Sequence, residues 1–260
     1  MLKFCNLFSG SSGNCSYVES DNAKILVDCG ASCKRTTEAL SSINVNIDDL
    51  DGILITHEHS DHVNGLSVIC KKYNIPIYCN EKTFSNLKKP VSVDCTKLFK
   101  TDSKFEINDL EILPFSIPHD AADPCGFNIV SDGKKISIAT DIGHMTKSIF
   151  KNLSGSDYLL LESNYEPEML KSSRYPYLLK KRILGPNGHL SNDDASEVLC
   201  LLTQYGVHNI MLGHLSQQNN FPELAYKTVA SAFISKNISS ENISLKVASR
   251  LTPDELITIA

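Results

Sequence analysis

The chain has 260 residues, of which 42% are hydrophobic, and its formal net charge is −5. This length can bury a sizeable core, so we expect one domain over residues 1–260. The charge excludes a general attraction to nucleic acid, although a local basic patch is compatible with it. No apolar run approaches the about 20 residues that cross a bilayer, and the N-terminus lacks a signal peptide's apolar region. We therefore expect a cytoplasmic protein without membrane contact.

The sequence contains 9 cysteines, an odd number, and no CxxC pair. Several of them, including Cys29, Cys70 and Cys200, lie within apolar patterns. This usage favours reduced, mostly buried thiols over a disulfide framework.

Short apolar segments alternate with helical patterns along the chain. We predict strands at residues 2–8, 15–19, 24–30, 52–55, 75–79, 97–99, 104–107, 110–117, 127–130, 135–140, 156–162, 208–214 and 256–259. The helices are predicted at residues 32–42, 61–73, 81–89 and 221–233, with another beginning near Ser191 or Asn192 and two helical segments between 165 and 182. The alternation indicates an α/β architecture.

Four candidate metal ligands lie within six residues, directly after the apolar strand at 52–55: His57, His59, Asp61 and His62. Residues two apart in an extended segment point the same way, so His57 and His59 can hold one ion together. Asp61 and His62 begin a helical pattern, which turns their side chains toward a second point. One loop is thus predicted to nucleate two metal sites. The alternative, solvated histidines in a turn, would be favoured for an isolated His-x-His.

Other polar residues follow predicted strands. The strand at 24–30 ends in the carboxylate Asp28 and the glycine Gly30. Asp141 emerges from an apolar strand, a position that suits a ligand bridging two ions. His119 and His214 also stand at strand ends, although a single histidine beside a proline is more often structural. His144 follows three residues after Asp141, and no role is assigned to it.

The string HEHSDH resembles the signature of the metallo-beta-lactamase superfamily. The resemblance implies a four-layer αββα sandwich, with two mixed β-sheets packed face to face and helices outside, and usually a binuclear metal hydrolase. It also implies a ligand set in which one ion is held by His57, His59 and His119, the other by Asp61, His62 and His214, with Asp141 bridging them and Asp28 holding the ligand loop by hydrogen bonds. Nitrogen and carboxylate donors without thiolate suit Zn²⁺ or Mn²⁺.

Over most of its length the chain is similar to the compact YycJ/WalJ-type subgroup of this superfamily. The supporting strings are FSGSSGN, THEHSDHVNGL, IPHDAADPCGF, ATDIGH, LESNYEPEML, RYPYLLKKRIL, GHLSNDDA and LGHLSQQNN. Proteins of that group are regarded as metal-dependent 5′-to-3′ exonucleases acting on DNA. The resemblance therefore implies a phosphodiesterase that uses a metal-bridging hydroxide, positioned with the help of Asp61. His189 lies in a segment that resembles the His-Ser-Thr loop of transfer-RNA 3′-processing nucleases, and we predict that it protonates the leaving group.

Basic residues are interleaved with tyrosines between residues 165 and 182, a mixture suited to phosphates and bases. Arg174, Lys181 and Arg182 are the candidate DNA contacts, and an ordinary solvated helix surface is an equal alternative. The turn at 9–14 offers Ser11 and Asn14 to an anion, although such a turn is more often a plain hairpin connection.

Two other functions stay open. A small-molecule hydrolase acting on a lactone, thioester or cyclic phosphodiester predicts a narrow pocket and little salt dependence. A non-enzymatic metal-binding or signalling protein predicts bound metal without turnover. The sequence leaves the native metal, the polarity of degradation and a homo-oligomeric state undecided.

Overall fold

The computed structural model describes residues 1–259. The chain divides into two compact units. The first consists of Met1–Ser116, Ala121–Lys134 and the residues from Ser249 onward, and the second of Ile117–Asp120 and Lys135–Ala248. The single domain expected over residues 1–260 stays a prediction.

The strands belong to two mixed sheets. They are β1 (Leu2–Phe8), β2 (Cys15–Glu19), β3 (Lys24–Val27), β4 (Gly52–Leu54), β5 (Ile77–Asn80), β6 (Thr96–Phe99), β7 (Phe105–Ile107), β8 (Leu110–Ser116), β9 (Cys125–Ser131), β10 (Lys134–Ala139), β11 (Tyr158–Glu162), β12 (Asn209–Gly213), β13 (Ser244–Val247) and β14 (Ile257–Ile259). The two seven-stranded sheets have the orders β14-β1-β2-β3-β4-β5-β6 and β13-β12-β11-β10-β9-β8-β7. Two mixed sheets of seven strands, accompanied by helices, confirm the predicted fold class.

The helices are α1 (Cys33–Ser42), α2 (Ser60–Val63), α3 (Leu66–Tyr73), α4 (Glu81–Ser85), α5 (Lys147–Leu153), α6 (Pro167–Ser172), α7 (Tyr177–Ile183), α8 (Asn192–Leu202) and α9 (Pro222–Ser235). Short 3₁₀ turns lie at Ile47–Asp49, Val93–Cys95 and Thr203–Tyr205. The predicted cap of α8 is confirmed, because Ser191 and Asp194 form a reciprocal capping box. Among the described residues, no helix is both long and apolar enough to cross a membrane.

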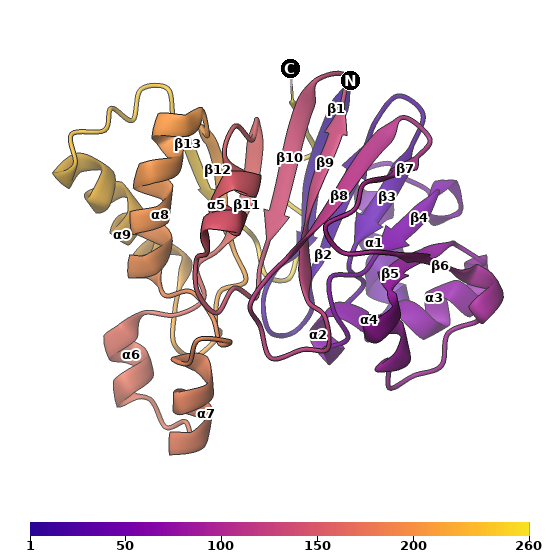
Figure 1. Cartoon of the computed structure of the whole chain (residues 1–260), viewed down its shortest axis with the longest axis horizontal. Coiled ribbons are helices and arrows are strands. Elements are labelled where there is room, and N and C mark those ends of the chain that lie inside the picture. The colour runs from indigo at the N-terminus through magenta and orange to yellow at the C-terminus, as the bar shows by residue number, and fades with distance from the viewer. Residues whose placement is uncertain (260) are drawn as a thin grey trace. The chain divides into compact units, whose positions relative to one another are not determined.

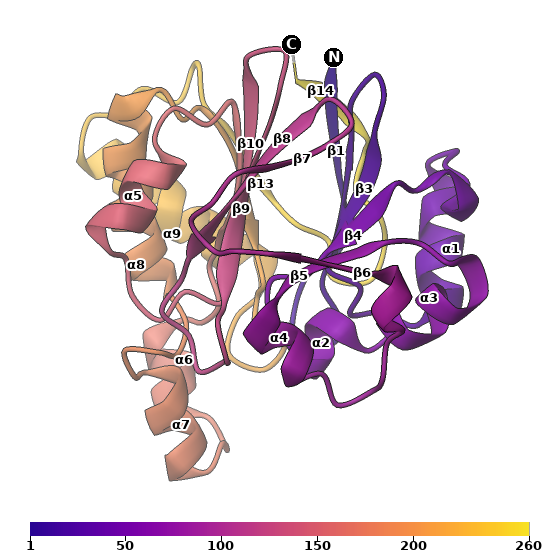
Figure 2. The same cartoon turned by 45° about the vertical axis from the view of Figure 1, so that its right-hand side comes forward.

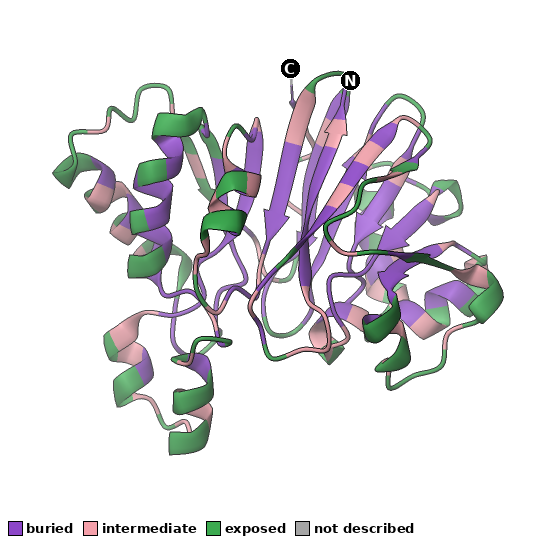
Figure 3. Cartoon of the chain, in the orientation of Figure 1, coloured by how far each residue is buried: buried purple, intermediate pink, exposed green. Residues whose placement is uncertain are grey.

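The core of the first unit lies on both faces of its sheet. Helices α1 and α3 pack their apolar side chains, including Leu40 and Ile69, against buried residues of β1 to β5 (Figures 1 and 3). On the opposite face, the rings of Tyr78 and Phe99 stack on Phe105 of β7, with centroids 5.6 and 5.3 Å apart. Aromatic stacking between β5, β6 and β7 therefore joins strands of the two sheets within this unit.

The second unit contains parallel strands, β10 to β13, and the helices beside them. The segments YLLLE of β11 and NIMLG of β12 are buried almost throughout, as expected for strands covered on both faces. Helices α5, α8 and α9 run beside these strands, and α6 and α7 lie beyond the carboxyl end of β11 (Figures 1 and 2). A separate small cluster of Tyr165, Leu170 and Ile183 holds α6 and α7 together.

Two predicted helices differ from those observed. The helix expected over 61–73 is divided into α2 and α3, because the Gly65 N–H donates to the Cys29 carbonyl at 2.9 Å. A Cβ at position 65 would meet the Ala31 carbonyl oxygen at 2.1 Å, so only glycine permits this approach. The helix expected over 81–89 ends at Ser85.

The cysteines of the described chain are all free, and most are buried, as predicted. Burial raises the pKa of the Cys29 thiol to about 12. Such a thiol stays protonated at neutral pH and packs as a small apolar side chain.

Candidate functional site

The predicted ligand loop of the first unit follows β4. The ring centroids of His57 and His59 are 4.6 Å apart, and those of His57 and His62 are 4.1 Å apart. Helix α2 begins after His59, and its turn brings the Asp61 carboxylate within 3.5 Å of His62 Nε2. The structure thus gathers the four ligand candidates of this loop, as the spacing indicated.

Asp28 lies behind the ligand loop and is buried. Its carboxylate accepts hydrogen bonds from the Thr56 N–H at 2.9 Å and from the Thr56 hydroxyl at 2.9 and 3.0 Å. His62 Nδ1 is 2.7 Å from Asp28 Oδ2, and His57 Nδ1 is 3.0 Å from the Thr56 hydroxyl. With Nδ1 occupied in this way, each imidazole offers its Nε2 to a cation. These contacts join Asp28 and Thr56 to the ligand loop.

Asn14 is buried beneath the same loop. Its N–H donates to the Asp61 carbonyl at 2.8 Å, and its side-chain nitrogen lies 3.1 Å from His62 Nε2. A Cβ at Gly30 would come within 1.7 Å of the Asp61 carbonyl oxygen, so the loop requires glycine there. Asn14 therefore contacts the ligand loop itself, whereas Ser11 is exposed at the tip of the turn.

The second unit gathers another set of donors. Asp141, Glu162, His189 and His214 each offer a ligand atom, and these atoms lie within 4.8 Å of one another. His119 joins them, because its Nε2 is 3.6 Å from Asp141 Oδ1 and its Nδ1 is 3.0 Å from the Gly188 carbonyl. Burial lowers the pKa of His119, which favours the neutral imidazole that binds metals.

Glu162 is a candidate site residue that the sequence analysis missed. It ends β11 and is fully buried, and its Oε1 lies 2.8 Å from both His189 Nδ1 and His214 Nδ1. Oε2 accepts the N–H groups of Ile142 at 2.8 Å and Leu190 at 3.0 Å. Burial alone would raise the pKa of this carboxyl, but the charge and hydrogen bond of His189 and those of His214 outweigh it and lower the pKa to about 2. A carboxylate after an apolar strand was the available signal, the same one that identified Asp28 and Asp141.

Three of the predicted site residues have left-handed backbone conformations. The φ angles are 64° at Asp28, 61° at Asp141 and 55° at His214. Such values are uncommon outside glycine and concentrate at functional positions. Each residue follows closely on a strand, so the chain turns sharply and the polar side chain stays at the strand's carboxyl end. The Asn164 side chain secures one of these turns by donating to the His214 carbonyl at 2.7 Å.

The three candidate DNA contacts, Arg174, Lys181 and Arg182, differ in their contacts within the protein. Arg182 donates to the Asp120 carboxylate through both Nε and Nη2, so it is engaged within the protein. Arg174 and Lys181 are exposed to solvent. His144 is also exposed, and its Nδ1 lies 2.8 Å from the Pro186 carbonyl, which places it outside the group around Glu162.

The donor chemistry of each unit fits a divalent transition metal. Imidazole nitrogens and carboxylate oxygens predominate, and several imidazoles are held through Nδ1 by a carboxylate, a hydroxyl or a carbonyl oxygen. This pattern is typical of metal-binding histidines, because the bond at Nδ1 fixes the ring and its tautomer. Fold and donor set define a metal-dependent hydrolase of the metallo-beta-lactamase type.

Comparison with known families agrees with this class. The model of the beta-lactamase superfamily domain matches residues 23–215, and the chain belongs to this family. Its relatives include the exodeoxyribonuclease YycJ of Bacillus anthracis, which is 38% identical over 232 residues covering 88% of each chain. The exodeoxyribonuclease WalJ of Streptococcus pneumoniae serotype 2 is 40% identical over 233 residues, 88% of this chain and 87% of that protein.

Solved structures show the same fold at lower identity. The metallo-beta-lactamase fold protein YhfI from Bacillus subtilis aligns with a TM-score of 0.73 and 16% identity, over 98% of this chain and 100% of its own. The short form of human tRNase Z aligns with a TM-score of 0.65 and 17% identity, over 99% of both chains. At these identities the likeness establishes the fold alone.

Proposed function

We propose that the ligand candidates hold two divalent metal ions, Zn²⁺ or Mn²⁺. The proposed ligands of one ion are His57, His59 and His119, those of the other are Asp61, His62 and His214, and Asp141 bridges them. The support comes from the donor chemistry, the Nδ1 contacts of the histidines and membership of the family. Two ions, when bound, lower the pKa of a water and neutralise charge on the attacked and leaving oxygens.

The protein's own residues take distinct parts in the proposed reaction. Asp61 lies in the ligand loop, where its carboxylate can orient the attacking water. His189 is half-buried and held at Nδ1 by Glu162, so its Nε2 is directed away from that carboxylate. We assign His189 the transfer of a proton to the departing oxygen, a role that typically contributes about 10²–10⁴-fold to rate. Glu162 orients this imidazole, because its Oε1 lies 2.8 Å from Nδ1.

We propose a phosphodiester of DNA as the substrate and 5′-to-3′ exonucleolytic cleavage as the reaction. The observation that carries this proposal is the 38–40% identity, over 88% of this chain, to proteins named exodeoxyribonucleases. The exposed Arg174 and Lys181 are the proposed contacts to phosphate, and Arg182 is a third basic residue beside them. Ser11, at an exposed turn near the ligand loop, is a further proposed contact.

The metal proposal is tested by elemental analysis of protein purified without chelator. The expected content approaches two equivalents per chain. A stable value of one, without any gain on added Zn²⁺ or Mn²⁺, contradicts the binuclear centre.

The substrate proposal is tested with single- and double-stranded DNA labelled at either end. We expect release of nucleotides from the 5′ end that chelator abolishes and either metal restores. Asp61→Asn is the control for contaminating nuclease, because it removes a ligand charge in the first turn of α2 while the backbone contacts of Asp61 remain. Turnover of a lactone, a thioester or a cyclic phosphodiester without turnover of DNA would favour a small-molecule hydrolase instead.

A further inference from the structure

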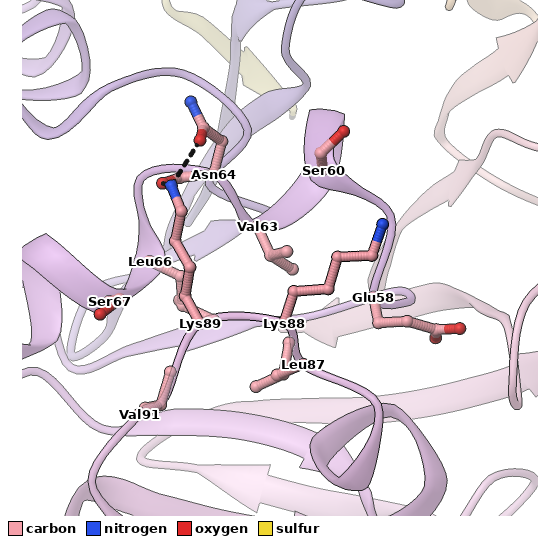
Figure 4. Close-up of a pocket in the computed structure, with 10 residues that line it drawn as sticks. All are labelled: Glu58, Ser60, Val63, Asn64, Leu66, Ser67, Leu87, Lys88, Lys89 and Val91. Carbon is pink, nitrogen blue, oxygen red and sulfur yellow. Dashed lines mark hydrogen bonds between the residues drawn. The ribbon is translucent and has the colours of Figure 1, made fainter.

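A cavity adjoins the ligand loop in the first unit (Figure 4). Its walls come from the loop at Glu58 and Ser60, from α2 and α3, and from the segment 87–91 that follows α4. Glu58 and Ser60 alternate with His57 and His59 along the chain, so an occupant of this cavity would contact residues directly beside proposed metal ligands.

The cavity combines an apolar wall with a cationic rim. Val63, Leu66, Leu87 and Val91 line the wall, and Lys88 and Lys89 stand at the rim. Lys89 is already engaged, because its amine donates to the Asn64 side chain at 2.8 Å and to the Asn64 carbonyl at 3.2 Å (Figure 4).

Lys88 differs from its neighbour. It is exposed, and among the described residues no hydrogen bond or ion pair engages its amine. Figure 4 shows its side chain extending toward Ser60 and Glu58. The Glu58 carboxylate also lines the cavity, and its Oε1 accepts the Ala122 N–H at 2.9 Å.

An apolar wall with one available ammonium suits a ligand that has a flat apolar body and an anionic group. A nucleotide has both, since its base fits between aliphatic side chains and its phosphate pairs with a lysine. A neutral apolar ligand would leave the lysine unused, and an inorganic anion would leave the apolar wall unused.

We propose that this cavity is a nucleotide subsite, in which the base packs against Val63, Leu66, Leu87 and Val91 and the phosphate pairs with Lys88. The proposal rests on the proposed function in one respect: it takes the occupant to be a nucleotide of the DNA strand being degraded. The subsite would then hold one end of the strand beside the ligand loop.

Binding of dAMP and of uncharged deoxyadenosine to the protein as purified, measured by calorimetry, tests the subsite without relying on hydrolysis. Lys88→Gln should weaken the binding of dAMP about tenfold, which corresponds to the loss of one charge-assisted hydrogen bond. The same substitution should change the affinity for deoxyadenosine little, because this ligand has no phosphate. Lys82→Gln is the matched control, because Lys82 is an exposed lysine of the neighbouring α4 that does not line the cavity.

Filling the cavity provides the second arm. Val91→Phe should weaken the binding of dAMP and of deoxyadenosine to the same extent. If this variant has a lowered melting temperature, Leu87→Phe is used in its place. Absent dAMP binding, or affinity that neither Lys88→Gln nor cavity filling changes, overturns the subsite.

The outcome for the subsite is separable from that for the proposed function. If the protein cleaves DNA but these substitutions do not change its affinity for dAMP, the nuclease proposal stands and the subsite is contradicted. Cavity-dependent dAMP binding without DNA cleavage would remove the nuclease proposal and keep a nucleotide-binding cavity.

Discussion

Arg182 forms a bidentate hydrogen-bonded contact with Asp120, the residue that directly follows His119. Its Nη2 is 3.0 Å from Asp120 Oδ1, and its Nε donates to Oδ2. The same Oδ1 lies 3.3 Å from His119 Nε2. Paired N–H groups hold a carboxylate in a fixed orientation, so Arg182 positions a group beside a proposed metal ligand.

This contact separates Arg182 from the other two basic residues that the sequence grouped with it. We expect the double substitution Arg174→Ala and Lys181→Ala to weaken DNA binding. On single strands it should also reduce the slope of log affinity against log salt by about 0.7 for each phosphate that the protein no longer neutralises. Its effect on bis(p-nitrophenyl) phosphate should be smaller. Arg182→Ala should slow the hydrolysis of DNA and of bis(p-nitrophenyl) phosphate to a similar extent, because it removes the contact that holds Asp120.

A salt titration of DNA binding and a chromogenic assay measure the two effects. A salt slope that the double substitution leaves unchanged would contradict the phosphate contacts of Arg174 and Lys181.

Glu162→Gln tests the carboxylate that links two histidines. Four donors converge on Glu162, namely the Nδ1 atoms of His189 and His214 and two backbone N–H groups. A glutamine amide has one acceptor atom, so it leaves some of these donors without a partner. We expect a loss of about 10–100-fold in metal affinity or activity, as is typical when a histidine loses its supporting group.

The matched control for this substitution is Glu197→Gln, which changes an exposed glutamate of α8. Metal content and kcat are measured for both variants. Normal values in Glu162→Gln would show that the histidines do not depend on this carboxylate.

Acid should destabilise the metal-free protein in part through Glu162. Its folded pKa, about 2, is below its ordinary value of 4.5, so the carboxylate contributes stability above about pH 4.5. That contribution is lost as the pH falls from about 4.5 toward 2. We therefore expect the melting temperature of the chelated wild type to fall more steeply over this range than that of Glu162→Gln. Parallel curves for the two proteins would contradict the depressed pKa.

His189→Ala should distinguish a proton donor from a structural histidine. A poor leaving group such as the 3′ alkoxide of DNA needs protonation, whereas nitrophenolate does not. We expect a loss of about 10²–10⁴-fold on DNA and a small loss on an activated nitrophenyl ester. Both rates are compared on one preparation with its metal content measured. A uniform loss, or one that follows missing metal, would remove His189 from the proton transfer.

The sequence by itself determined the strand-end positions of the site. Asp28, Asp141 and His214 each follow closely on an apolar strand, and the carboxyl ends of parallel strands lie at one edge of a sheet. The ligand loop was equally readable, because its spacing is local and the helix that turns Asp61 begins within the motif. These features depend on the period of a strand and the first turn of a helix, which neighbouring residues set.

Only the tertiary structure decided which distant groups occupy the remaining hydrogen-bonding positions. Gly65 divides the helix expected over 61–73 because its N–H bonds to Cys29, 36 positions earlier. Glu162 gained its role because β11 ends between two histidines that lie 27 and 52 residues further along the chain. Arg182 was indistinguishable from Arg174 in sequence, and the contact to Asp120 sets it apart. Such partners depend on how the strands and helices pack, and no local pattern of residues encodes that choice.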